Sequence, residues 1–146
     1  MFDGLKSALS SIGIILGLFL ASCSSTGSRN ACVYPEAPSD ELLRGRLLHI
    51  QIVDAETGEV ASYDSQGNPV LEGGQPLALW AEFETPTRIE ICVIEKGDHP
   101  QPLHHSEVTF SETIKMQPLG RYDIGSYLLH IVMDGTLAAT IQFDVR

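Results

Sequence analysis

The chain has 146 residues, with 9 Lys and Arg against 19 Asp and Glu, and its formal net charge is −10. This length suits a single domain. Because 43% of the residues are hydrophobic and 19% are charged, the chain is too apolar to be a disordered acidic tail. The negative balance also argues against a protein that neutralises nucleic-acid phosphates, so we expect no nucleic-acid partner.

The N-terminus has the form of a secretory leader. An apolar run from Ile12 to Ala21, interrupted by two glycines, follows a short start that carries Lys6. The run is too short to span a bilayer, which takes about 20 apolar residues, and it has the length of the central part of a signal peptide. We therefore expect residues 1–22 to be cleaved from the mature protein.

The run ends in Leu20-Ala21-Ser22-Cys23, which resembles the lipobox of bacterial lipoprotein precursors. The resemblance implies that the Cys23 thiol is diacylated and becomes the mature N-terminus, with the lipid bilayer as its first partner. Each buried acyl methylene contributes about 0.8 kcal/mol to membrane binding, so several acyl chains hold a water-soluble domain on a membrane. Ser24 resembles the sorting pattern of enteric lipoproteins, which implies the outer membrane facing the periplasm rather than the inner membrane.

Residues 23–44 have the composition of a lipidated N-terminus and flexible tether, because Ser, Pro, Ala and Gly are frequent there. Besides Cys23, the chain has two cysteines, Cys32 and Cys92. In an oxidising compartment an even pair favours a disulfide, and two buried thiols are the alternative. A bridge would close a loop of about 60 residues and contribute about 4 kcal/mol to stability in the chain-entropy model.

From residue 45 onward, short stretches of alternating apolar and polar residues are separated by turn residues, without a long amphipathic pattern. This arrangement predicts an all-β fold. The expected core-facing residues are Leu48, Ile50 and Ile52 in a first strand, Leu77, Leu79, Ala81 and Phe83 in a second, and Ile89, Ile91 and Val93 in a third. Less regular strands are expected at 107–110 and 113–116.

The sharpest local signal is Asp134-Gly135, between apolar stretches at 127–133 and 136–145. Asp-Gly suits a type I′ turn, in which both central residues have positive φ, so the two stretches should form a hairpin. The residues of its second strand expected to face the core are Leu137, Ala139, Ile141, Phe143 and Val145.

Just before this hairpin, Asp123, Gly125 and Tyr127 resemble the tyrosine corner of immunoglobulin-like domains, in which the Tyr hydroxyl bonds to the backbone upstream. The resemblance implies that residues 45–146 form an immunoglobulin-like antiparallel β-sandwich. Leu129 stands where antibody domains have their second cysteine, so the inter-sheet disulfide of those domains is not expected. A fold of this kind does not by itself imply an activity.

Three histidines, His99, His104 and His105, lie close together in the sequence. Imidazoles beside a carboxylate can hold a borderline metal ion, but the spacing matches no zinc signature, and a solvated loop is the alternative interpretation. The acidic stretch 54–72 offers oxygen ligands for calcium, although its Asp and Asn residues are also ordinary turn formers. The sequence carries no recognisable catalytic motif or cofactor signature, and we expect a protein that is not an enzyme.

Trp80 is expected on the outward face of its strand. Cys92 and Ile94 have the matching parity on the next strand, so one hypothesis is an apolar partner surface formed by Trp80 and Ile94. The alternative is that the tether, held by Cys32, covers this patch within the monomer.

Together these features predict a lipid-anchored, non-catalytic binding or structural accessory module of a bacterial envelope complex. Such a module would offer loops or a free strand edge to an envelope protein. Two other functions stay open: a metal or small-ligand carrier that uses the histidine loop, and a small hydrolase inhibitor whose loops enter an active-site cleft.

Overall fold

The computed structural model describes residues 32–34 and 36–146. The predicted signal peptide at 1–22 and the predicted lipidation site Cys23 lie outside these residues, and both stay predictions. No helix in the described part of the chain is long and apolar enough to cross a membrane.

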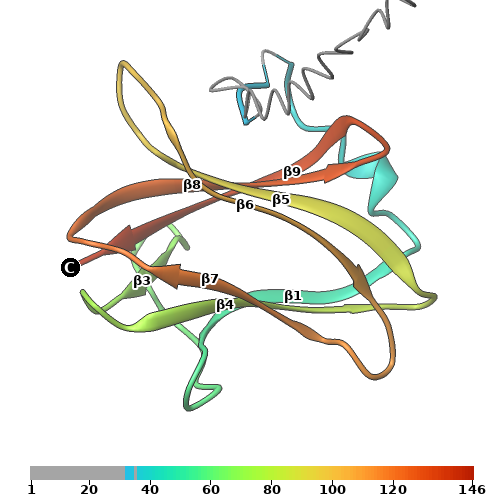
Figure 1. The fold of residues 1–146 in the computed structure, drawn as a ribbon, viewed down its shortest axis with the longest axis horizontal. Coiled ribbons are helices and arrows are strands. Elements are labelled where there is room, and N and C mark those ends of the chain that lie inside the picture. Colours follow the sequence, from blue (N-terminus) through green and yellow to red (C-terminus); the bar gives the residue numbers. More distant parts are fainter. Residues whose placement is uncertain (1–31, 35) are drawn as a thin grey trace, which may run out of the picture.

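The described residues form two layers of β-strands packed face to face (Figure 1). One sheet has three strands in the order β1-β4-β7, and the other has six in the order β2-β3-β9-β8-β5-β6. The strands are β1 (Leu47–Asp54), β2 (Ser62–Tyr63), β3 (Pro69–Leu71), β4 (Pro76–Phe83), β5 (Thr87–Glu95), β6 (Pro102–Phe110), β7 (Met116–Arg121), β8 (Gly125–Met133) and β9 (Thr136–Val145). A 3-10 helix, η1 (Asp40–Leu42), precedes β1.

Neighbouring strands run antiparallel, except that β3 lies parallel to β9. The prediction of an all-β sandwich is confirmed. The core lies between the sheets, where the apolar faces predicted for β4 and β5 meet. Phe110 of β6 and Phe143 of β9 are among its largest fully buried side chains. Since alternate residues of a strand face opposite sides, the alternating pattern placed β4 and β5 correctly.

In β1 the predicted core face is partly wrong. Leu48 is 58% exposed, whereas Ile50 and Ile52 pack against the core. A β-bulge between Leu47 and His49 interrupts the pairing with β4. Such a bulge adds one residue to the strand and reverses the side to which the preceding side chains point. Leu47 therefore packs against the core in place of Leu48.

Of the two irregular strands, the one expected at 107–110 is the end of β6, while the one expected at 113–116 is wrong. The chain turns there, and β7 begins only at Met116. The turn is closed twice, because the Ser111 N–H donates to the Ile114 carbonyl at 3.0 Å and the Ile114 N–H donates to Ser111 Oγ at 3.2 Å. These bonds hold the backbone in a turn that the sequence pattern did not reveal.

The hairpin formed by β8 and β9 is confirmed, and its turn residues Asp134 and Gly135 have φ values of 51° and 76°. One core assignment in β9 is wrong, because the register shifts between Ile131 and Val132. Past this bulge, Leu137 pairs with Val132 on the outer face of the sheet. It is still buried there, but Ala138 joins the core cluster between the sheets instead.

The described part of the predicted tether is held against the six-stranded sheet. Cys32 is fully buried, and Leu43 belongs to the hydrophobic core. The Ser39 N–H donates to the Leu137 carbonyl at 2.9 Å, and η1 lies beside the beginning of β9 (Figure 1). This segment differs from the flexible tether that its composition predicts, because burial and backbone bonds restrain it.

Candidate functional site

Polar residues from four neighbouring strands lie in register on the outer face of the six-stranded sheet. His105 of β6 is the pairing partner of Cys92 in β5, and Cys92 is also that of His130 in β8. His130 in turn pairs with Thr140 of β9. Directly opposed residues have their Cβ atoms about 5 Å apart. This outer-face row, His105-Cys92-His130-Thr140, therefore places an imidazole on either side of one cysteine.

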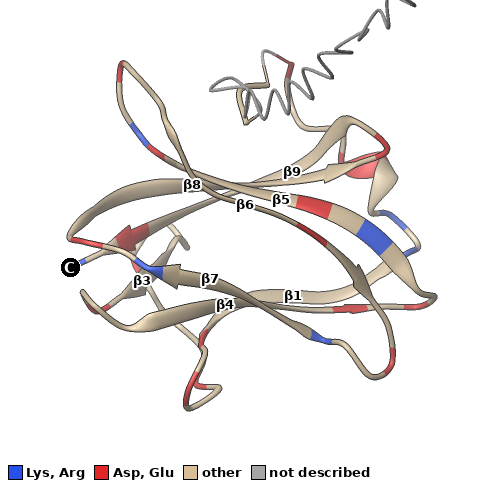
Figure 2. Cartoon of the chain, in the orientation of Figure 1, with Lys and Arg blue, Asp and Glu red and all other residues tan. Residues whose placement is uncertain are grey.

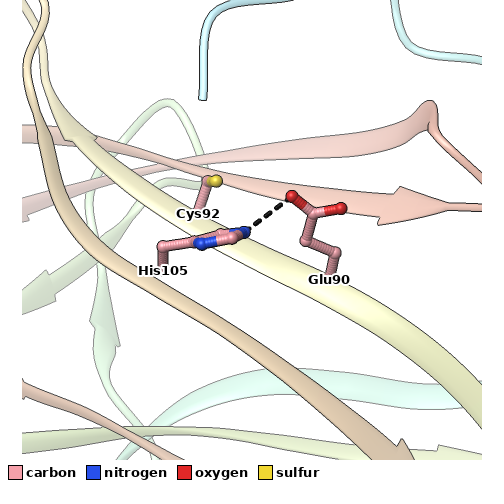
Figure 3. Close-up of side chains that lie close together, drawn as sticks. All are labelled: Glu90, Cys92 and His105. Carbon is pink, nitrogen blue, oxygen red and sulfur yellow. Dashed lines mark hydrogen bonds and ion pairs between the residues drawn. The ribbon is translucent and has the colours of Figure 1, made fainter. Parts of the chain in front are cut away.

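Glu90 of β5 lies beside the outer-face row, next to His105. It lies two residues before Cys92 and therefore on the same face of β5. His105 Nε2 lies 2.7 Å from Glu90 Oε1 (Figure 3), and the imidazole is the donor because an ionised carboxylate only accepts. The ligand atoms of Glu90, Cys92 and His105 all lie within 4.8 Å of one another, the one such group in the described part of the chain.

His130, at the centre of the sheet, is only 7% exposed. Its Nδ1 lies 2.9 Å from Thr140 Oγ1, and the ring of Tyr34 contacts its ring edge-on at 5.7 Å between centroids. Burial lowers the pKa of His130, since desolvation disfavours the imidazolium. For the same reason burial raises the pKa of Tyr34, and the charge of Glu90 raises it further.

The N-terminal segment covers the middle of the outer-face row. The structure joins Cys32 to Cys92 in a disulfide with a Cα–Cα distance of 5.6 Å, the first of the two states considered for this pair. The bridge forms a small apolar cluster with Ile94 and Leu128. As a disulfide sulfur, Cys92 cannot act as a thiolate ligand or nucleophile in this state.

The three sequence-predicted histidines do not form one metal site. His104 and His105 are consecutive residues of β6 and therefore point to opposite faces of the sheet, while His99 lies in the loop before β6. His104 Nε2 lies 2.9 Å from Ser106 Oγ, and its pKa is lowered by burial and then by the neighbouring His105. β-strand alternation separates their side chains, so the three do not converge as ligands of one metal ion.

The predicted partner surface shared by Trp80 and Ile94 is also wrong. Trp80 lies in β4 of the three-stranded sheet, whereas Ile94 lies in β5 of the six-stranded sheet. The chain crosses from one sheet to the other between these two strands, so they do not pair. Trp80 instead contacts His49, with 5.2 Å between ring centroids, and Lys115 Nζ lies 6.0 Å from the indole centroid. The alternative interpretation holds for Ile94 alone, which the Cys32 segment covers.

The acidic stretch 54–72 uses its carboxylates to shape turns. Asp54 Oδ1 accepts the backbone N–H groups of Glu56 at 2.7 Å and Thr57 at 2.8 Å. Asp64 Oδ1 accepts those of Gln66 and Asn68. The bond from Thr57 is the main cause that lowers the pKa of Asp54, and the bond from Asn68 does the same for Asp64. The structure therefore favours the interpretation of these residues as turn formers.

One edge of the six-stranded sheet is the second candidate site. The nine-residue strand β6 pairs with β5 on one side, and no other described strand pairs with its outer side. Two features disturb the pairing of its first residues: Pro102, and a bulge opposite Val93 and Ile94. Residues 104–110 therefore form a regular edge. Glu107 is already paired with Arg88 of β5, and this pairing lowers the pKa of Glu107. Figure 2 shows that β5 carries both acidic and basic residues.

A cleft of about 530 Å³ adjoins the beginning of this edge. It lies between β6 and the connection from β7 to β8, and residues that line it include Leu103, Arg121 and Ile124. Leu103 is 50% exposed and Ile124 is 78% exposed. Two exposed aliphatic side chains beside an unpaired strand edge are features of a surface that binds an extended chain.

Sequence reasoning missed His130 of the outer-face row and Glu90, which contacts His105 beside it. The parity of Cys92 puts Glu90 on its face, but the position of His130 depends on β5 pairing with β8, which sequence alone did not provide. Comparison of the sequence with protein-family models and with curated proteins gives no match.

Proposed function

We propose that this protein is a lipid-anchored, non-catalytic binding module of a bacterial envelope complex. In this proposal the acylated Cys23 holds the domain on the membrane, most naturally the outer membrane on its periplasmic side. The edge of β6 at 104–110 binds an extended segment of a larger envelope protein as an additional strand. The single observation that carries the binding function is this unpaired edge with the cleft at its end.

The disulfide supports an extracytoplasmic location. Structural disulfides persist in oxidising compartments such as the bacterial periplasm and are rare in reducing ones. Cys32 and Cys92 are both fully buried and lie 60 residues apart in the sequence, so the bridge joins the N-terminal segment to the sheet. Because Cys32 follows the proposed anchor Cys23 closely in the sequence, the bridge attaches the sheet to the chain near that anchor.

The β6 edge supports recognition by strand addition. Unpaired edge strands offer backbone N–H and C=O groups to another strand, and proteins usually protect them with charges, prolines or bulges. Here the bulge and Pro102 stand at one end only, and the charge of Glu107 is paired with Arg88. A partner strand on 104–110 would place its next residues at the cleft, where an apolar side chain would contact Leu103 and Ile124.

The anchor is tested on the protein extracted from bacterial membranes. We expect the wild type to partition into detergent, to lack residues 1–22 and to carry acyl mass on Cys23, because buried acyl chains dominate membrane affinity. The variant Cys23→Ser should remain in the aqueous phase. A wild-type product that retains Met1, or that partitions into buffer, contradicts the anchor.

The binding edge is tested by site-specific photo-cross-linking in cells. A photoreactive residue at Thr109, exposed on β6, should cross-link to a defined segment of an envelope protein, while the same residue at Ser65 in the exposed β2–β3 turn should not. A synthetic peptide of the captured segment should then slow hydrogen exchange of the amides at 104–110 in the purified protein. Equal capture at both positions, or unchanged exchange, contradicts strand addition.

A further inference from the structure

The group formed by Glu90, Cys92 and His105 has a composition that its present role does not explain. A carboxylate, a sulfur and an imidazole converge within 4.8 Å, and these three ligand types together suit Zn²⁺ and similar borderline cations. The sulfur is engaged in the bridge to Cys32. The disulfide therefore decides whether the group can bind a metal.

We propose that reduction of the Cys32–Cys92 disulfide converts this group into a binding site for one divalent zinc-type cation. A dithiol reductant supplies two electrons and two protons to the S–S bond, which breaks to give two thiols while the reductant becomes a disulfide. On binding the cation, the Cys92 and Cys32 thiols each release one proton to the solvent and bind as thiolates. Glu90 and His105 supply the second and third ligands, and Cys32, freed beside Cys92, supplies the fourth.

The sheet positions these ligands before any metal arrives. Cys92 and His105 are direct partners across β5 and β6, and Glu90 Oε1 already contacts His105 Nε2 at 2.7 Å. Tetrahedral zinc with bonds of about 2.0–2.3 Å keeps its ligand atoms about 3.5 Å apart. The glutamate and the imidazole are both partly exposed, so their side chains have room to rotate toward that spacing.

The neighbouring residues fit the same site. His130 flanks Cys92 on its β8 side and contacts Tyr34. Ile94 and Leu128 pack in the same apolar cluster as the two cysteines. Such surroundings exclude water from the thiolate and hold it in place, as the outer contacts of metal ligands generally do. Metal binding and disulfide formation thus compete for the Cys92 sulfur.

The test titrates Co²⁺, a spectroscopic probe for zinc sites, into the full-length protein in detergent. After reduction and anaerobic removal of the reductant, we expect one Co²⁺ per chain with thiolate-to-cobalt charge-transfer absorption, and we expect none in the oxidised protein. The reduced variant His105→Ala should bind Co²⁺ at least about 10-fold more weakly. The matched control is His104→Ala, one residue away on the opposite face, and it should bind as the wild type does.

A second variant covers the effect of reduction on folding. Cys32→Ser leaves a free Cys92 thiol without any reductant, and it should still bind Co²⁺ with one thiolate, more weakly than the reduced wild type. Circular dichroism should show the β-sheet spectrum both in the reduced wild type and in the Cys32→Ser variant. Absence of charge-transfer absorption, equal binding by the oxidised protein, equal binding by His105→Ala, or loss of the sheet in both forms would overturn the proposal.

Discussion

Tyr127 Oη donates a hydrogen bond to the backbone carbonyl of Asp123 at 2.8 Å, which is the contact that its resemblance to a tyrosine corner implies. The Tyr127 ring stacks on Phe143 with 5.3 Å between centroids and packs against Tyr122 at 5.1 Å. Tyr122 makes a parallel bond, since its hydroxyl donates to the Leu119 carbonyl at 2.7 Å. Two consecutive backbone carbonyl bonds thus fix the connection from β7 into β8.

Replacement of Tyr127 by Phe removes the hydroxyl and keeps the stacked ring. We expect the free energy of unfolding to fall by about 1 kcal/mol, the usual net worth of such a hydrogen bond. Urea denaturation measures the change, and Tyr63→Phe is the control because Tyr63 is 55% exposed on β2. Equal stability of the two variants would contradict a stabilising role for the corner.

The disulfide should be a large contribution to the stability of the domain. Cys32→Ser opens a loop with a sequence separation of 60, and the chain-entropy model gives a loss of about 4 kcal/mol. Urea unfolding of the variant without reductant should match that of the wild type with reductant. If the variant unfolds at the same urea concentration as the oxidised wild type, the bridge does not stabilise the fold.

The β8–β9 turn depends on the left-handed backbone of Gly135, whose φ is 76°. A Cβ at this position meets no atom within 4 Å, so the effect of Gly135→Ala comes from the backbone alone. We expect a loss of about 1 kcal/mol, because an L-residue is strained in this conformation. Gly97→Ala is the matched control, since Gly97 is equally unobstructed and lies outside the left-handed region. Equal urea midpoints for the two variants would contradict this explanation.

The sequence predicted most strand faces because one face of each sheet is buried and alternation then fixes every side chain. It failed at Leu48 and Leu137, where β-bulges reverse the alternation. A bulge depends on how two strands pair, so the pattern of one strand alone did not show it. The hairpin at Asp134-Gly135 was predictable, since its turn geometry requires particular residues at particular positions.

The candidate site was less predictable than the fold. Sequence distance suggested His104 and His105 as joint ligands, but adjacent strand residues face opposite ways. Alternation along each strand suggested that Trp80 and Ile94 share one outward-facing surface, but β4 and β5 belong to different sheets. The disulfide partners could be named by counting cysteines, whereas the contact of His105 with Glu90 required the register of β5 and β6.

His130 gives the domain a pH-dependent stability whose sign follows from its burial. Desolvation lowers its pKa below the value of about 6.5 for an exposed histidine, so the unfolded chain binds this proton more readily than the folded one. The associated stability is complete above that value and is lost progressively as the pH falls from it through the lower pKa of the folded state. Asp54 and Asp64, with lowered pKa values, lose their contributions only at more acidic pH.

Urea unfolding between about pH 7 and pH 5 tests this dependence. We expect the wild type to lose stability across this range, and His130→Asn, whose amide can still bond to Thr140, to lose less of it. His104 contributes with the same sign because its pKa is also lowered, so some dependence should remain in the variant. The control His99→Asn, at an exposed loop position, should behave as the wild type does. An unchanged pH dependence in His130→Asn would show that protonation of His130 is not linked to folding.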